Sequence, residues 1–133
     1  MAMLEQLVTL PGALASFEFR GSGELLAYTI KEPTILDLDT LDLLAHMCAA
    51  NMSIATMQAR GWEKMTAMKG FYPVGQFTLV GFDWSVVVSG VRREIKKKAG
   101  EDYLPPFVGV VIANQKADYE AAFKALEATG EAE

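Results

Sequence analysis

The stretch from Asp37 to Met68 constrains the fold most strongly, because its apolar residues recur at three- and four-residue steps. This spacing is typical of an amphipathic helix, and Asp37 or Asp39 is a suitable N-cap. The helix is predicted to break or end near Gly61, since Gly is the costliest ordinary residue in a helix interior. Its apolar residues form two adjacent stripes. The first consists of Leu41, Leu44, Ala45, Cys48, Met52, Ala55 and Ala59, and the second of Leu43, Met47, Ala50, Ile54, Met57 and Gly61.

Two apolar stripes on one helix require two partners, because a helix that covers one face of a small sheet buries only one stripe. Composition agrees with a second partner: Gly and the apolar residues other than Tyr make up 75 of 133 residues, or 56%, against a usual share of roughly 45–50%. We therefore expect a homodimer that buries more than about 1,200 Å² in total. The residues predicted for the dimer or partner interface are Leu43, Met47, Ala50, Ile54, Met57, Phe77 and Leu79.

The rest of the chain predicts two further helices and five strands. A short helix over Met3–Leu10 ends at Pro11-Gly12, and a last helix covers about Lys116–Ala128. Alternating or continuous apolar runs predict strands over Ala13–Arg20, Glu24–Ile30, Val74–Val80, Trp84–Val91 and Phe107–Ala113. The order α-β-β-α-β-β-β-α predicts an α+β sandwich with a mainly antiparallel five-stranded sheet. We expect a single domain over residues 1–128 and a frayed tail over 129–133.

Charge and composition exclude several classes of protein. The net charge of −5 argues against nucleic-acid binding. No transmembrane segment is expected, because the longest uncharged run, Leu43–Ala59, has 17 residues and contains several polar side chains. The N-terminus has no basic region before its apolar residues, so a secretory signal is not expected. A single cysteine cannot form an internal disulfide. These features predict a cytoplasmic protein.

His46 and Cys48 are the only histidine and the only cysteine. Because they lie two residues apart on the predicted helix, their side chains point about 200° apart and cannot act together as a nucleophile and base. Cys48 is either a thiol sensor or a small buried residue of the core. His46 is either a solvated residue or part of a partner surface. No catalytic, cofactor or metal site is predicted.

A basic segment interrupts this acidic chain. Five of the twelve cationic residues fall within seven positions, at Arg92, Arg93, Lys96, Lys97 and Lys98. Such a patch could hold a phosphate-bearing ligand, an acidic partner or a membrane surface. The alternative is a solvated turn whose charge is neutralised by Glu101 and Asp102, which follow directly.

Three segments carry a resemblance to a known family: MLEQLVTLPG, GELLAY and HMCAANMSIATMQARGW. Over about Met3–Leu126 the chain resembles the roadblock/LC7 superfamily, and more narrowly the small prokaryotic branch called DUF2173. The resemblance implies a homodimer in which the third strands pair edge to edge and the central helices cross the joined sheet. It also implies a scaffold, a dynein light chain or a regulator of small GTPases.

The preferred interpretation is therefore a non-catalytic homodimeric module for protein–protein interaction, without a cofactor. The resemblance implies that the narrower branch occurs in sulfur-oxidising and related bacteria, without an assigned activity. This supports a second hypothesis, an accessory protein of sulfur or redox metabolism that binds a small ligand or uses Cys48 covalently. Its partner would be a redox or sulfur-metabolism complex rather than a small GTPase.

Overall fold

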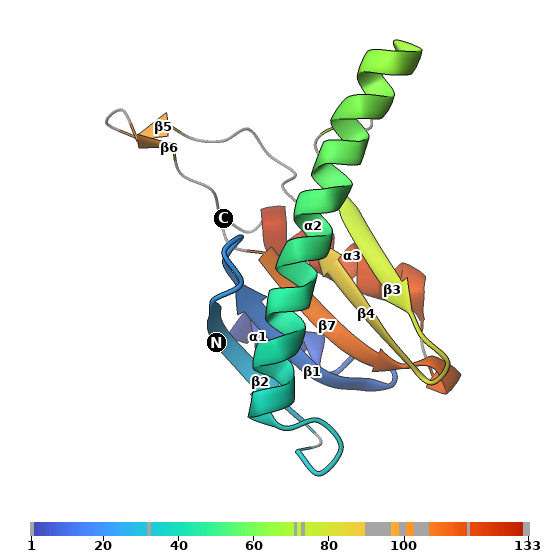
Figure 1. Cartoon of the computed structure of the whole chain (residues 1–133). Coiled ribbons are helices and arrows are strands. Elements are labelled where there is room, and N and C mark those ends of the chain that lie inside the picture. Colours follow the sequence, from blue (N-terminus) through green and yellow to red (C-terminus); the bar gives the residue numbers. More distant parts are fainter. Residues whose placement is uncertain are drawn as a thin grey trace.

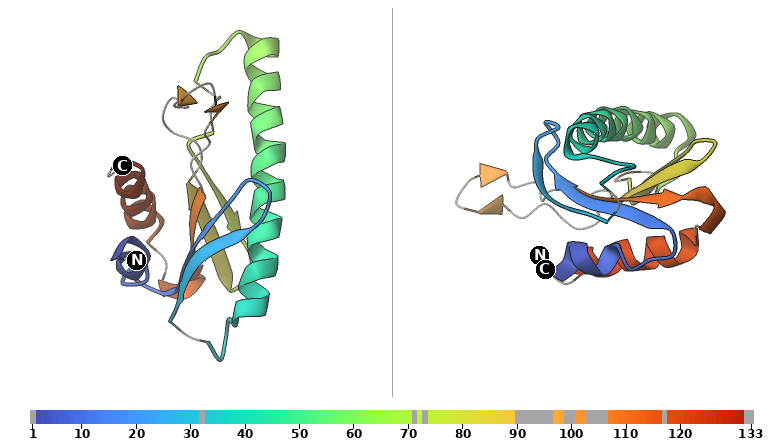
Figure 2. Two further views of the ribbon diagram at one scale, coloured as in Figure 1. Left: turned by 90° about the vertical axis from the view of Figure 1, so that its left-hand side faces the viewer. Right: turned by 90° about the horizontal axis from the view of Figure 1, so that it is seen from below.

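The computed structural model describes residues 2–31, 33–70, 72, 74–89, 97–98, 101–102, 107–116 and 118–131. It has three layers: a long helix, α2, lies on one face of a sheet, and two shorter helices, α1 and α3, lie on the other (Figure 1 and Figure 2). These helices are α1 (Ala2–Leu7), α2 (Leu38–Thr66) and α3 (Tyr119–Glu131). The predicted α+β sandwich with a long central helix is confirmed.

The main sheet has five strands in the order β2-β1-β7-β4-β3, and all neighbouring pairs are antiparallel. The central position of β7 explains its continuous apolar sequence, because both of its faces are covered. At one margin lies β3, which pairs with β4 alone among the described residues. The strands are β1 (Ala13–Phe19), β2 (Leu25–Ile30), β3 (Gln76–Val80), β4 (Trp84–Ser89) and β7 (Phe107–Ala113). A separate two-stranded ribbon joins β5 (Lys97–Lys98) to β6 (Glu101–Asp102).

Most predicted boundaries differ from the observed ones by one to three residues. The last strand matches at both ends, whereas β3 begins at Gln76 rather than Val74. The last helix, α3, begins at Tyr119 after a 3-10 turn over Asn114–Lys116 and continues to Glu131. Residues 90 and 91, predicted to end the fourth strand, lie outside the described residues.

Two apolar clusters fill the spaces on either side of the sheet. On the α2 side, the fully buried rings of Phe17 and Phe19 stack with centroids 5.4 Å apart. A Cβ on Gly109 of the neighbouring strand would lie 2.7 Å from the Phe17 ring, so only glycine leaves room for that ring. The other cluster is covered by α1 and α3 and contains Leu4, Leu7, Val87, Val110, Ile112, Ala122 and Leu126.

α2 begins at the predicted N-cap, where the Asp37 carboxylate accepts a hydrogen bond from the Thr40 amide at 2.9 Å. This hydrogen bond holds the pKa of Asp37 below its usual value. The prediction that the helix breaks or ends near Gly61 is wrong, because α2 continues to Thr66. A helical Gly costs roughly 0.5–1 kcal/mol relative to Ala, so other contacts must stabilise the last turns.

Those contacts lie at the C-terminal end of α2. Ala67 adopts a left-handed conformation and its amide donates to the Glu63 carbonyl oxygen at 2.9 Å, which caps the helix. The Glu63 carboxylate accepts from the amides of Gly70 and Tyr72, both at 2.9 Å. The guanidinium of Arg60 lies 4.5 Å from the centre of the Tyr72 ring. The loop after α2 is therefore tied to the helix that it leaves.

The turn between β1 and β2 packs on α2 through Gly23. This residue has a φ of +100°, and a Cβ there would lie 2.7 Å from Cδ2 of His46. We expect Gly23→Ala to lower the free energy of unfolding by roughly 1–3 kcal/mol, because it adds both backbone strain and a clash. Chemical denaturation with a linear fit measures the change.

Gly21→Ala in the same turn is the matched control, because its added Cβ would make only an ordinary contact at 3.8 Å. In a His46→Ala background the cost of Gly23→Ala should shrink but not vanish, since the backbone strain remains while the ring is gone. Equal effects of Gly21→Ala and Gly23→Ala would contradict this packing.

Candidate functional site

The second apolar stripe of α2 faces away from the sheet. The residues of α2 that are buried are Leu41, Ala45, Cys48, Ala49, Met52 and Ala59, which lie on the opposite, sheet-facing side. The large side chains of the second stripe remain exposed: 62% for Leu43, 50% for Met47, 51% for Ile54 and 68% for Met57. Ala50 is exposed as well. We call Leu43, Met47, Ala50, Ile54, Met57 and Gly61 the outer seam of α2.

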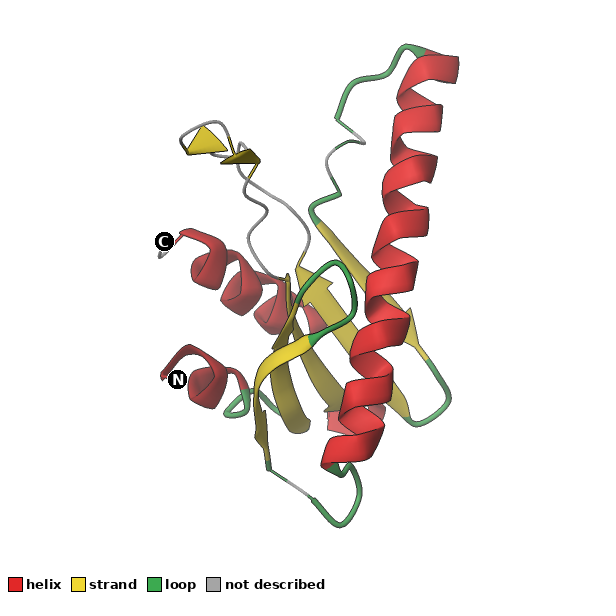
Figure 3. Cartoon of the chain, turned by 60° about the vertical axis from the view of Figure 1, so that its left-hand side comes forward, coloured by secondary structure: helices red, strands yellow, loops and turns green. Residues whose placement is uncertain are grey.

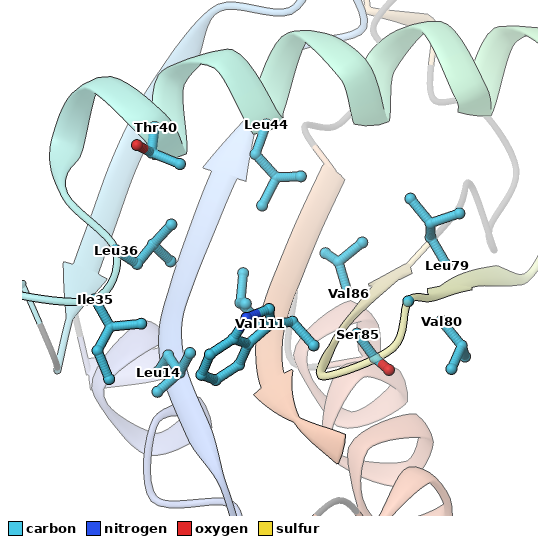
Figure 4. A pocket seen from close by; sticks show the side chains of 12 residues that line it. Leu14, Ile35, Leu36, Thr40, Leu44, Leu79, Val80, Ser85, Val86 and Val111 are labelled. Atoms are coloured by element: carbon cyan, nitrogen blue, oxygen red, sulfur yellow. The ribbon is translucent and has the colours of Figure 1, made fainter.

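A second apolar surface lies beside α2, where the helix leaves part of the sheet uncovered. Here a half-open cavity of about 510 Å³ is enclosed by the first turns of α2 and by β1, β7, β4 and β3 (Figure 4). Its walls include Leu14, Ile35, Leu44, Leu79, Trp84 and Val111. Among the described residues that line this cavity, none carries an ionisable side chain. We call it the β3 groove.

The β3 groove is not apparent from the sequence. Its walls come from five separate segments, and only Leu79 among them was predicted as an interface residue. Ile35 is 54% exposed and Trp84 is 44% exposed. In the sequence, the only local sign of the groove is the apolar pair Ile35-Leu36 just before the helix. Such a pair stands out because loop residues in contact with solvent are more often polar.

The free margin of β3 borders the groove. Gly81 N donates to Trp84 O at 2.8 Å, and hydrogen-bonded pairs alternate along an antiparallel ladder. The backbone N–H and C=O groups of Phe77 and Leu79 therefore form hydrogen bonds with β4. The backbone groups of Thr78 and Val80 point away from β4, toward the open side of the sheet. Phe77 is half-buried and packs against the core on the α2 side, whereas Leu79 is 48% exposed.

The residues predicted as one interface thus lie on two surfaces. Leu43, Met47, Ala50, Ile54 and Met57 share the outer seam, which faces away from the sheet. Phe77 and Leu79 lie at the sheet margin, where Leu79 lines the β3 groove. Helical spacing alone identifies which residues share a face, but it does not say where that face points relative to an edge strand.

The C-terminal part of α2 extends past the sheet (Figure 3). Ala59 is the last buried residue of the helix. Beyond it, Trp62 is 54% exposed and Met65 is 82% exposed, and Met68 in the following loop is 59% exposed. This projecting end exposes large apolar side chains although its backbone is well fixed by Ala67 and Glu63.

Cys48 lies under α2, against the sheet, with only 1% of its surface exposed. Burial raises the pKa of the Cys48 thiol to about 12. The thiolate is the reactive form of cysteine, so very little of this group is reactive near neutral pH. The geometry favours the core role of Cys48 over the thiol-sensor role.

His46 lies on an exposed face of α2 against the β1–β2 turn. Its Nδ1 lies 2.8 Å from the carbonyl oxygen of Asp42, and its ring occupies the space that a Cβ on Gly23 would fill. His46 therefore supports the packing of the hairpin on the helix. The sequence does not reveal this role, because it depends on a residue 23 positions away.

The basic segment is described only in part. Arg92, Arg93 and Lys96 lie outside the described residues, whereas Lys97–Lys98 forms β5. The register places Lys97 opposite Asp102 and Lys98 opposite Glu101. This pairing is compatible with the alternative in which the basic segment forms a neutralised turn.

The described residues contain neither a metal-binding cluster nor a helix that could span a membrane. Within the described ranges, no group of three or more His, Cys, Asp or Glu side chains could hold a metal ion. No helix in the part of the chain that the structure describes has both the length and the hydropathy to cross a membrane.

We expect the Cys48 thiol to resist aromatic disulfide reagents in the native protein and to react fully in guanidinium chloride. Its raised pKa also predicts that stability falls as pH rises above about 9, because the unfolded chain then loses the thiol proton and the folded chain keeps it until about pH 12. A Cys48→Ala variant should lack that part of the pH dependence. Rapid labelling of the native thiol at neutral pH would contradict its burial.

Comparison with known proteins agrees with this architecture. Among solved structures, the chain is similar to a roadblock/LC7 domain from Streptomyces avermitilis, with 13% identity, a TM-score of 0.68, and coverage of 95% of this chain and 87% of that one. It is also similar to MglB of Myxococcus xanthus, with 16% identity, a TM-score of 0.61, and coverage of 99% and 94%. MglC of the same organism gives 15% identity, a TM-score of 0.57, and coverage of 96% and 90%.

At these identities the structural matches establish the fold, which is the roadblock/LC7 fold. No curated protein matches the sequence. The model of one family, described as "Uncharacterized conserved protein (DUF2173)", matches residues 3–103. That match spans most of the chain, and the chain therefore belongs to the DUF2173 family and has the roadblock/LC7 fold.

Proposed function

We propose that this protein is a non-catalytic module for protein–protein interaction that acts as a homodimer. The observation that carries the proposal is an apolar groove that adjoins the outward-pointing backbone groups of β3. An open strand edge beside exposed apolar side chains is a template for pairing with another chain. The proposed partner is a second copy, with the two β3 strands antiparallel and adjacent.

Two-fold symmetry places the projecting end of α2 in this dimer. The helix runs past the sheet at the end where β3 begins, while the β3 groove lies toward the end where β3 finishes (Figure 1). A two-fold axis through the middle of the paired β3 strands exchanges these two ends. The projecting end of each α2 then lies over the groove of the other subunit, and apolar side chains of that end cover its walls.

This arrangement buries two apolar surfaces at once. Trp62 follows the buried Ala59 by one helical turn of α2, and it is 54% exposed in one chain. Leu79 and Trp84, which are 48% and 44% exposed, lie on the receiving surface. Aromatic side chains are the residues that most often dominate the energetics of such contacts.

The class of partner that the module serves is proposed from the fold alone. One similar structure is described as a gliding protein of Thermus thermophilus, and the roadblock/LC7 resemblance implies regulators of small GTPases. A small GTPase is therefore the partner class that we propose for the dimer. A role in sulfur or redox metabolism through Cys48 has less support, because the buried thiol has a raised pKa.

Thr78→Pro tests the proposed pairing of β3. Proline at this position removes an amide that points away from β4, so the β3–β4 ladder within the chain should remain intact. We expect the variant to lose dimerisation through β3 while its far-ultraviolet circular dichroism stays close to that of the unmodified protein. Size-exclusion chromatography with light scattering measures the mass of the assembly.

Thr78→Val is the matched control, because it keeps both the amide and the β-branched shape. It should retain the mass of the unmodified protein. If Thr78→Pro folds and keeps that mass too, the chains do not associate through the β3 margin and the proposed dimer is wrong.

A further inference from the structure

A second cavity adjoins the β3 groove, and Lys31 is one of its walls. It is half-open, has a volume of about 520 Å³, and shares the side chains of Leu14, Ile35 and Trp84 with the groove. Leu14 and Ile35 lie on one side of the groove, and Leu79 lies on the other (Figure 4). The two cavities therefore meet on the side of the groove away from Leu79. We call the second one the Lys31 cavity.

The Lys31 cavity differs from the β3 groove in its chemistry. It is lined in part by the polar side chains of Lys31, Asp83 and Gln115, and all three residues are exposed. Neither Lys31 nor Asp83 forms an ion pair with a described residue. The Lys31 ammonium donates a long hydrogen bond, at 3.5 Å, to the Val8 carbonyl oxygen. One positive and one negative charge of this cavity are thus available to a ligand.

Hydrogen bonds fix the backbone on both sides of the Lys31 cavity. The Lys31 amide donates to the Leu14 carbonyl oxygen at 2.7 Å. In the β3–β4 turn, the side-chain amide of Asn114 donates to the Gly81 carbonyl oxygen at 2.8 Å, and its backbone amide donates to the Asp83 carbonyl oxygen at 2.8 Å. A ligand loses less affinity to ordering when the groups that it meets are already held in place.

We propose that the two cavities together bind one small amphiphile with a single alkyl chain and a zwitterionic head group. The β3 groove takes the alkyl chain, because the described side chains that line it carry no charge. The Lys31 cavity takes the head group, whose anionic part pairs with the Lys31 ammonium and whose cationic part pairs with the Asp83 carboxylate.

The pair of opposite charges selects this class of head group. A purely anionic head would face the Asp83 carboxylate, and a purely cationic head would face the Lys31 ammonium, so each would meet one repulsive charge. The volumes of about 510 Å³ and 520 Å³ both fall in the range of roughly 300–1,000 Å³ that small-molecule sites occupy. One chain forms the whole site, so the inference goes beyond the proposed dimer and does not depend on it.

Trp84 fluorescence tests the position of the alkyl chain. Trp62→Phe leaves Trp84 as the only tryptophan, and Trp84 is 44% exposed where the two cavities meet. Titration with decylphosphocholine below its micellar concentration should give a saturable blue shift of the emission. Octylphosphocholine should bind about tenfold more weakly, because it buries two fewer methylene groups. Equal affinities for these two compounds would overturn the placement of the alkyl chain.

The charge of the head group tests the Lys31 cavity. With the same decyl chain, phosphocholine should bind about two- to fivefold more tightly than a carboxylate or a trimethylammonium head, the effect of one exposed charge pair. Lys31→Met should remove the preference over trimethylammonium, and Asp83→Asn should remove the preference over carboxylate. Lys64→Met is the matched control and should change neither preference, because Lys64 is an exposed lysine that lines neither cavity.

Failure of the ligand site and failure of the β3 dimer give different results, because each titration is also run in a Thr78→Pro background. Binding by both proteins supports the ligand site whatever the mass of the assembly. Binding by the Thr78→Pro protein alone supports the site and shows that the dimer closes the groove to the ligand. The absence of a saturable shift in both proteins, or equal affinities for the three head groups, would overturn the site and leave the test of the dimer by mass unaffected.

Discussion

The structure depends on a helix that has more apolar surface than its own sheet can cover. α2 buries Leu41, Ala45, Cys48 and Met52 against the sheet, and this contact fills the core on one side of β1, β7 and β4. Because α2 crosses the sheet and then runs past it, part of the sheet is left as an open groove. The outer seam, the β3 groove and the projecting end all follow from the placement of this one helix.

These exposed apolar surfaces indicate association, because burying them is favourable. A Leu, Ile or Met side chain that passes from full exposure to full burial contributes about 1.5–3 kcal/mol, and side chains that start half exposed contribute correspondingly less. Monomeric proteins rarely expose contiguous apolar patches of this kind. The surfaces also differ in kind. The β3 margin offers backbone hydrogen bonds beside an apolar groove, whereas the outer seam offers side-chain packing alone.

Much of the fold could be predicted from periodicity. The continuous run Phe107–Ala113 identified the central strand at both ends, and the alternation from Ala13 predicted the start of β1. The end of α2 could not be predicted from Gly61, because the cap is made by Ala67 in a left-handed conformation and by contacts of Glu63 with Gly70 and Tyr72. Such contacts depend on how the loop folds back, and no local propensity encodes them.

The candidate site was predictable only in part for the same reason. The spacing of Leu43, Met47, Ile54 and Met57 identified a shared apolar face, and the structure leaves that face exposed. The groove was not predictable, because Leu14, Ile35 and Trp84 come together only through the strand order. The packing of His46 on Gly23 likewise depends on where the β1–β2 turn meets the helix.

Residue-resolved hydrogen exchange of β3 tests most directly the claim that a second copy covers the β3 margin. In a single chain the Leu79 amide is bonded to β4, whereas the amides of Thr78 and Val80 point to solvent. Paired β3 strands predict that all three amides exchange slowly, and that Thr78 and Val80 lose their protection when the protein is diluted until it dissociates. Fast exchange of Thr78 and Val80 at every concentration, beside a protected Leu79, would contradict the account.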